Sequence, residues 1–123
     1  MIRMKLGAMN HPQRELKSEI KFVAENFDFL DLTIEPGTVY SEDVNTEQAL
    51  KLKDKYKLHI IGHTPWNLPI ASPYKTVRDA AFKEYEKCLS VFSRLKVNLV
   101  NIHPHTAQDI SDPKEIIKLN IEP

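Results

Sequence analysis

The feature that most constrains the fold of this chain is a fourfold alternation of short apolar runs with longer amphipathic stretches. The alternation has a period of about 30 residues, which is the length of one strand–helix–strand unit. Repeated units of this kind form right-handed connections on a parallel sheet. The expected strands are 4–9, 29–34, 58–62 and 97–102, and the expected helices are 14–26, 45–57 and 72–95, with a fourth starting at 112.

The same alternation is typical of open doubly wound sheets and of (β/α)8 barrels. The four residues that start at Gly7, Gly-Ala-Met-Asn, do not match a glycine-rich dinucleotide loop, which argues against a Rossmann fold. A complete barrel needs about 250 residues, so a chain of 123 residues can supply only half of one. The sequence therefore predicts an α/β fold in which residues 1–123 form a single parallel (β/α)4 unit, the N-terminal half of a TIM barrel.

Local signals place the starts of two helices and the core of one. Asn45 followed by Gln48 predicts a capping-box start. Ser72 followed by Pro73 predicts a serine cap with proline in the first turn. The third helix carries the clearest apolar stripe, which comprises Val77, Ala81, Tyr85, Cys88, Phe92 and Leu95. Because Cys88 lies on this stripe, we expect it to be a core residue and not a nucleophile.

The second strand has a polar face. Its leucines and isoleucine face one side, while Asp31, Thr33 and Glu35 face the other. Polar groups on a buried strand require a site or a paired network. We expect Asp31 and Thr33 to form such a network. Glu35, at the strand end, is a candidate general base, metal ligand or acceptor from a sugar hydroxyl, with a solvated loop carboxylate as the alternative.

Histidines follow the ends of the expected strands. Four of the five, at positions 11, 63, 103 and 105, come just after a strand, at the end of a parallel sheet where ligands bind. His59 is expected to be a core residue or to support a ligand. His63 and His103 end neighbouring strands and are candidate ligands for zinc or manganese. The alternative is a hydrogen-bonded pair of strand-end histidines.

Three further residues are candidates for contacting a substrate. His11 and His105 each flank a proline, and we expect them at the rim of a pocket. Trp66 follows the sequence His-Thr-Pro, and on such a loop an indole either stacks on a sugar or base or covers the barrel rim.

Composition limits the partners and the compartment. Lys and Arg together equal Asp and Glu at 17, so net charge gives no reason to expect polyanion binding. One cysteine excludes an intrachain disulfide and suits a reducing compartment. No segment has the roughly 20 apolar residues of a membrane helix, and the N-terminus lacks the features of a signal peptide. We expect a cytoplasmic protein that does not associate with membranes.

Two segments resemble those of a known superfamily. The sequence from Gly62 to Pro73, Gly-His-Thr-Pro-Trp-Asn-Leu-Pro-Ile-Ala-Ser-Pro, resembles the His-Ala-Pro-Tyr…Asn-Leu-Ala-Ser-Pro segment of endonuclease IV-type proteins. Ile102-His103-Pro104 is similar to their His-Pro-Gly strand end. Residues 4–9 and 31–36 resemble the first two strands of sugar-phosphate isomerase/epimerase relatives. Both groups belong to the xylose-isomerase-like (β/α)8 superfamily.

The resemblance implies a divalent-metal enzyme that acts on a sugar or sugar phosphate. We place an isomerase or epimerase ahead of the alternative, a zinc-dependent endonuclease acting at abasic sites in DNA. In the endonuclease branch the residues matching His63 and His103 ligate zinc, and in the isomerase branch such positions more often line the substrate pocket. The chain departs from the endonuclease pattern in having His105 instead of glycine and Trp66 instead of tyrosine.

The resemblance also implies an incomplete site. The bridging glutamate and the other ligands of the superfamily lie on strands five to eight, so His63 and His103 are only part of a ligand set. Three expectations remain open. The chain is a fragment of a longer product, a subunit that completes a barrel as a homodimer, or a non-catalytic half barrel that functions only on oligomerisation.

Overall fold

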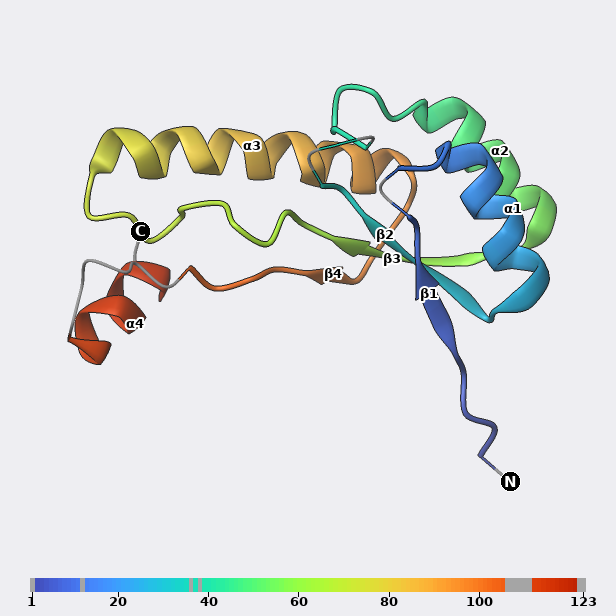
Figure 1. Ribbon diagram of the computed structural model, residues 1–123, viewed down its shortest axis with the longest axis horizontal. Coiled ribbons are helices and arrows are strands. Elements are labelled where there is room, and N and C mark those ends of the chain that lie inside the picture. Colours follow the sequence, from blue (N-terminus) through green and yellow to red (C-terminus); the bar gives the residue numbers. More distant parts are fainter. Residues whose placement is uncertain (1, 12, 36, 38, 106–111, 122–123) are drawn as a thin grey trace.

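The computed structural model describes residues 2–11, 13–35, 37, 39–105 and 112–121 (Figure 1). Strands and helices alternate along this part of the chain, as the sequence predicts. The strands are β1 (Gly7–Met9), β2 (Phe29–Thr33), β3 (His59–His63) and β4 (Val100–Asn101). The helices are α1 (Leu16–Asn26), α2 (Thr46–Tyr56), α3 (Lys75–Arg94) and α4 (Pro113–Ile121).

The four strands form one parallel sheet in the order β1-β2-β3-β4. Sequential order with every strand parallel is the arrangement of a (β/α) barrel wall, because a doubly wound sheet reverses its strand order at a switch point. The predicted α/β fold, a (β/α)4 half of a TIM barrel, is therefore confirmed.

The core lies on one face of this sheet, between the strands and the first three helices. Leu30, Leu32 and Ile60 point from β2 and β3 into this layer and are at most 2% exposed. They pack in one cluster with residues of α1, α2 and α3, which Figure 1 shows together above the sheet. Cys88 belongs to the same cluster and is 2% exposed, as the apolar stripe predicts.

The opposite face of the sheet carries the polar residues. In the register of β2 and β3, Asp31 pairs with Ile61 and Thr33 pairs with His63. In the register of β3 and β4, His63 pairs with Asn101. Because paired residues of neighbouring strands point to the same side, these side chains share the face that the first three helices leave uncovered.

The starts of α2 and α4 follow the sequence. The side chain of Asn45 accepts a hydrogen bond from the backbone N–H of Gln48 at 2.9 Å, so the predicted cap of α2 is confirmed. The carboxylate of Asp112 accepts from the N–H of Lys114 at the start of α4. α2 ends at Tyr56, and the residue that caps it, Lys57, adopts a left-handed backbone with φ of 51°.

The predicted start of the third helix is wrong by two residues. Ser72 Oγ accepts from the N–H of Tyr74 at 3.2 Å and makes a turn, and its carbonyl accepts from the guanidinium of Arg78. The helix therefore begins at Lys75, after Tyr74. Val77 falls in its first turn and is 40% exposed, so the predicted buried stripe starts one turn later, at Ala81.

The two outer strands, β1 and β4, are shorter than predicted. β1 begins at Gly7, because Gly7 pairs with Phe29, the first residue of β2. β4 pairs only with Gly62 and His63.

His59, expected to be a core or ligand-supporting residue, is exposed, because it begins β3 on the uncovered face. Among the described helices, none is long and apolar enough to span a bilayer.

Burial should make the single cysteine unreactive in the folded chain. Burial, together with the nearby carboxylates of Glu84 and Glu42, raises the pKa of the Cys88 thiol to about 11. Because the thiolate is the reactive form, we expect negligible alkylation by iodoacetamide at pH 8 and complete alkylation in denaturant, measured by mass spectrometry. Rapid modification of the folded chain would contradict this placement of Cys88.

Candidate metal centre

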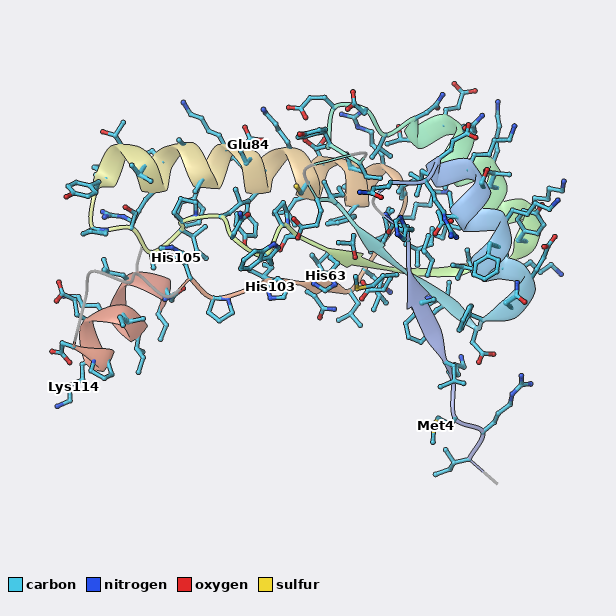
Figure 2. All side chains as sticks on the ribbon, viewed as in Figure 1. Met4, His63, Glu84, His103, His105 and Lys114 are labelled. Atoms are coloured by element: carbon cyan, nitrogen blue, oxygen red, sulfur yellow. The ribbon has the colours of Figure 1, made fainter. Side chains whose placement is uncertain are left out.

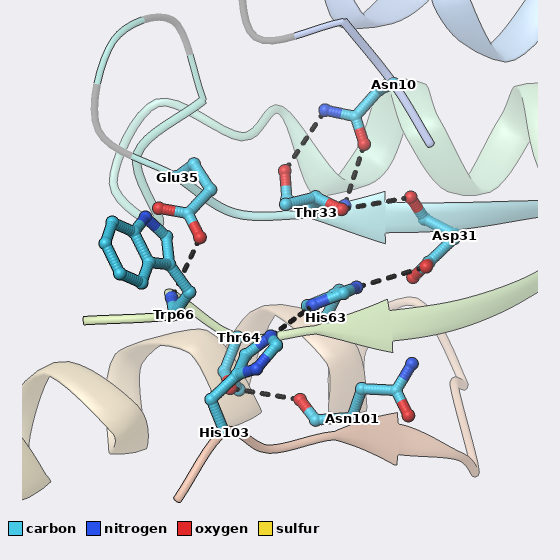
Figure 3. Close-up of polar contacts among 9 residues, drawn as sticks. All are labelled: Asn10, Asp31, Thr33, Glu35, His63, Thr64, Trp66, Asn101 and His103. Carbon is cyan, nitrogen blue, oxygen red and sulfur yellow. Dashed lines mark hydrogen bonds and ion pairs between the residues drawn. The ribbon is translucent and has the colours of Figure 1, made fainter. Parts of the chain in front are cut away.

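Two imidazoles meet at the C-terminal ends of β3 and β4 (Figure 3). Nε2 of His63 and Nε2 of His103 lie 2.6 Å apart. Their rings stack with centroids 4.8 Å apart and an interplanar angle of 28°. His63 is the last residue of β3, and His103 follows the end of β4 by two residues. We refer to these two residues as the histidine pair. The structure thus brings the two predicted metal ligands into contact.

A carboxylate lies behind one member of the histidine pair. Oδ2 of Asp31 is 3.1 Å from Nδ1 of His63, on the side of the ring opposite to His103. Both side chains are 17% exposed. Asp31 reaches His63 because both lie on the uncovered face of neighbouring strands. The predicted polar network of the second strand therefore includes a histidine of the candidate site.

Backbone hydrogen bonds fix the strand ends on which the two histidines sit. The N–H and the hydroxyl of Thr64 both donate to the carbonyl of Asn101, at 3.1 and 3.0 Å. The phenol of Tyr85, from α3, lies 3.4 Å from the carbonyl of His103 and donates to it. Burial raises the pKa of Tyr85, which keeps the phenol protonated as a donor. These contacts hold His103 beside β3 although strand pairing has ended at Asn101.

Glu35 and Trp66 meet beside the histidine pair. Oε1 of Glu35 accepts a hydrogen bond from the backbone N–H of Trp66 at 2.9 Å, which ties the loop after β2 to the loop after β3. The indole of Trp66 is 67% exposed. Within the described residues, no hydrogen bond joins Glu35 to either imidazole of the pair. In this structure Glu35, the predicted general base, therefore holds the backbone of Trp66 in place.

The other two predicted site residues lie apart from the histidine pair. His11 is exposed, and its Nδ1 accepts from the N–H of Gln13 in the same turn. His105 lies further along the segment after β4, toward α4 (Figure 2). The amide of Asn120 binds both the N–H and the carbonyl of His105, each at 2.8 Å. Neither imidazole is hydrogen-bonded to His63 or His103.

Sequence reasoning did not assign Asp31, Thr64 or Tyr85 to the site. The alternation in β2 places Asp31 on the polar face, but the contact with His63 depends on the register of β2 against β3. Thr64 directly follows His63, and this position is the signal that could have assigned it to the site. Tyr85 lies on the apolar stripe of α3, and that stripe gives no indication that its hydroxyl reaches the carbonyl of His103.

The donor atoms of the histidine pair fit part of a site for a divalent transition metal. Imidazole nitrogens are ligands for zinc, iron and manganese. Metal-binding histidines commonly donate their second N–H to a carboxylate, and Nδ1 of His63 lies 3.1 Å from Oδ2 of Asp31. A catalytic zinc takes three protein ligands, and no group of three suitable side chains occurs within the described ranges. The pair therefore supplies two ligands of a larger set.

Comparisons with known proteins agree with this architecture. No family model matches the chain. The chain is 36% identical over 72 residues to a probable endonuclease 4 from Aquifex aeolicus (strain VF5). The aligned region covers 57% of this chain and 25% of that protein. A D-tagatose 3-epimerase-like structure superposes on 95% of the chain with a TM-score of 0.79 and 26% identity. A D-psicose 3-epimerase from Clostridium cellulolyticum H10 superposes on 97% with a TM-score of 0.67 and 20% identity.

The fold and the site define half of a (β/α)8 barrel with a histidine pair at the C-terminal ends of its strands. The chain spans a quarter of its curated relative and 45% of each structural neighbour. Together, the curated relative and the D-tagatose 3-epimerase-like structure support the xylose-isomerase-like TIM-barrel superfamily for this chain, which corresponds to part of that barrel.

Proposed function

We propose that the chain supplies the N-terminal half of a divalent-metal-dependent sugar or sugar-phosphate isomerase or epimerase. The convergence of the two Nε2 atoms at 2.6 Å, with a carboxylate behind His63, is the observation that carries this proposal. The likeness to a D-tagatose 3-epimerase-like structure over 95% of the chain supports a sugar as the substrate. The formal net charge of zero is compatible with a small substrate.

In this proposal, His63 and His103 hold the metal, which when bound polarises the carbonyl and hydroxyl oxygens of the sugar. Glu35 would remove the proton from the carbon beside the carbonyl, and an acid from outside this chain would return a proton to the opposite face of that carbon. The hydrogen bond from the N–H of Trp66 orients the carboxylate of Glu35. The exposed indole of Trp66 packs against the sugar ring. His11 and His105 contribute only to the rim of the pocket.

The test is epimerisation at C3 of a ketohexose. The purified chain is incubated with manganese and D-fructose or D-tagatose, and the products are separated by chromatography. We expect the C3 epimer to form only with metal, and to be absent with the His63→Ala variant and in excess chelator. If the metal-loaded chain leaves both sugars unchanged, in every oligomeric form that it adopts, this function is wrong for the chain.

The sequence match favours a second candidate, a zinc-dependent endonuclease that cleaves DNA at abasic sites. The 36% identity over 72 residues to a probable endonuclease 4 is the observation in its favour, and the neutral net charge is the observation against it. Zinc-dependent cleavage of a duplex oligonucleotide with one abasic site, without cleavage of the undamaged duplex, would select this candidate over the epimerase.

Both candidates need protein groups beyond this chain. The uncovered face and the β4 edge expose apolar side chains, including Met9 at 54%, Leu99 at 58% and Ile102 at 54%, and unpaired strand edges favour association. We propose that a second half barrel, supplied by another copy of the chain, covers them in a homodimer. Static light scattering should give twice the mass of 14.2 kDa, whereas a monomer at all concentrations would contradict this assembly.

A further inference from the structure

We propose that Asp31 is a positioning residue, which holds His63 in the tautomer and ring orientation that direct its Nε2 toward His103 and a bound metal. This inference rests on the proposed metal function of the histidine pair and deepens it. It assigns a role to the one carboxylate that contacts the pair through a side-chain hydrogen bond within the described residues.

The backbone sets the position of Asp31. It lies in the middle of β2 and pairs with Ile61, two residues before His63 in β3. Its side chain therefore meets His63 diagonally, on the uncovered face of the sheet. Figure 3 shows Asp31, His63 and His103 in one line, with His63 between the other two. Because both strands lie inside the sheet, with neighbours on each side, their backbones fix the distance between Asp31 and His63.

The contact determines which ring nitrogen of His63 carries hydrogen. A carboxylate can only accept a hydrogen bond, so Nδ1 of His63 donates to Oδ2 of Asp31 across 3.1 Å. In a neutral imidazole the other nitrogen, Nε2, then has a free lone pair. That lone pair faces Nε2 of His103 at 2.6 Å. The hydrogen between the two rings consequently belongs to His103, and a metal ion would take its place.

Packing alone does not account for a carboxylate at this position. Oδ1 of Asp31 is buried and makes no hydrogen bond within the described residues. A buried polar atom without a partner costs free energy, so an apolar side chain would serve the fold at least as well. What Asp31 adds is the hydrogen bond to His63, which is the arrangement that orients metal-binding histidines and increases their basicity.

The test compares Asp31→Ala and Asp31→Asn with the wild-type chain and with Asp54→Ala, which removes an exposed aspartate of α2. Zinc affinity is measured by calorimetric titration, and circular dichroism verifies folding. Two-bond 1H–15N NMR spectra of the metal-free chain report which nitrogen of His63 carries hydrogen. This NMR readout would not change if Asp31 had only a structural role.

We expect Asp31→Ala to weaken zinc binding by roughly 10–100-fold and to move hydrogen from Nδ1 to Nε2 of His63. Asp31→Asn should retain much of the affinity, because its amide oxygen still accepts from Nδ1. Wild-type affinity and an unchanged His63 tautomer in Asp31→Ala would overturn this inference alone. If Asp31→Ala does not fold, the NMR spectrum of the wild-type chain decides the question, because hydrogen on Nε2 of His63 instead of Nδ1 would overturn the inference. If wild-type zinc affinity equals that of His63→Ala, the proposed metal function itself fails.

Discussion

Replacing His63 or His103 with alanine is expected to weaken zinc binding by roughly 100-fold or more, because either change removes one of two converging donors. The loss should exceed that caused by changing Asp31, which supports a ligand without being one. Binding to the folded state also stabilises it in proportion to the logarithm of metal concentration over Kd. The zinc-induced rise in melting temperature should therefore disappear together with the binding.

His59 provides a matched control for this experiment. It lies at the start of β3, on the same face of the sheet as His63, and it is exposed. His59→Ala thus removes an imidazole from the same strand without changing the histidine pair, and it should bind zinc like the wild type. If His59→Ala reduces zinc affinity as much as His63→Ala, the binding is an adventitious property of surface histidines and the assigned site is wrong.

Replacing Phe92 with alanine is expected to lower the free energy of unfolding by about 3–5 kcal/mol. Phe92 is the largest of the fully buried side chains and is 1% exposed. Its ring packs directly on Gly62, where an added Cβ would come within 2.9 Å of the ring. Folded domains have total stabilities of about 5–15 kcal/mol, so this single change removes a large share. Urea denaturation followed by circular dichroism measures the effect.

The position of Phe92 also connects the core to the site. Gly62 directly precedes His63, so the contact between α3 and β3 supports the strand end that presents the imidazole. Phe22→Ala is the control, since Phe22 is 49% exposed on α1, and it should cost far less. Equal stability losses for the two variants would mean that α3 does not pack on the sheet as described.

The sequence predicts the fold well because its signals are periodic. Helical spacing of apolar residues and the alternation in β2 depend only on neighbours along the chain. The positions of His63 and His103 follow from the same pattern, since strands of one parallel sheet bring their C-terminal ends to one edge. The start of α3 was predicted wrongly because the hydroxyl of Ser72 binds the N–H of Tyr74 and forms a turn instead of a cap.

The contacts that position the histidine pair depend on register, which the sequence does not specify. A shift of two residues between β2 and β3 would keep Asp31 on the polar face but move it away from His63, and the alternation of apolar and polar residues does not distinguish these two registers. The same holds for Tyr85, whose hydroxyl reaches the carbonyl of His103 from a helix 18 positions earlier in the chain. Such contacts become visible only when the elements are placed in space.

X-ray absorption at the zinc edge of the zinc-loaded chain tests the central claim, that His63 and His103 together bind a metal, most directly. We expect outer-shell scattering from two imidazoles per zinc, retained in His59→Ala and lost in the double variant His63→Ala/His103→Ala. A spectrum of hydrated zinc, or imidazole scattering that persists in the double variant, would contradict the assignment.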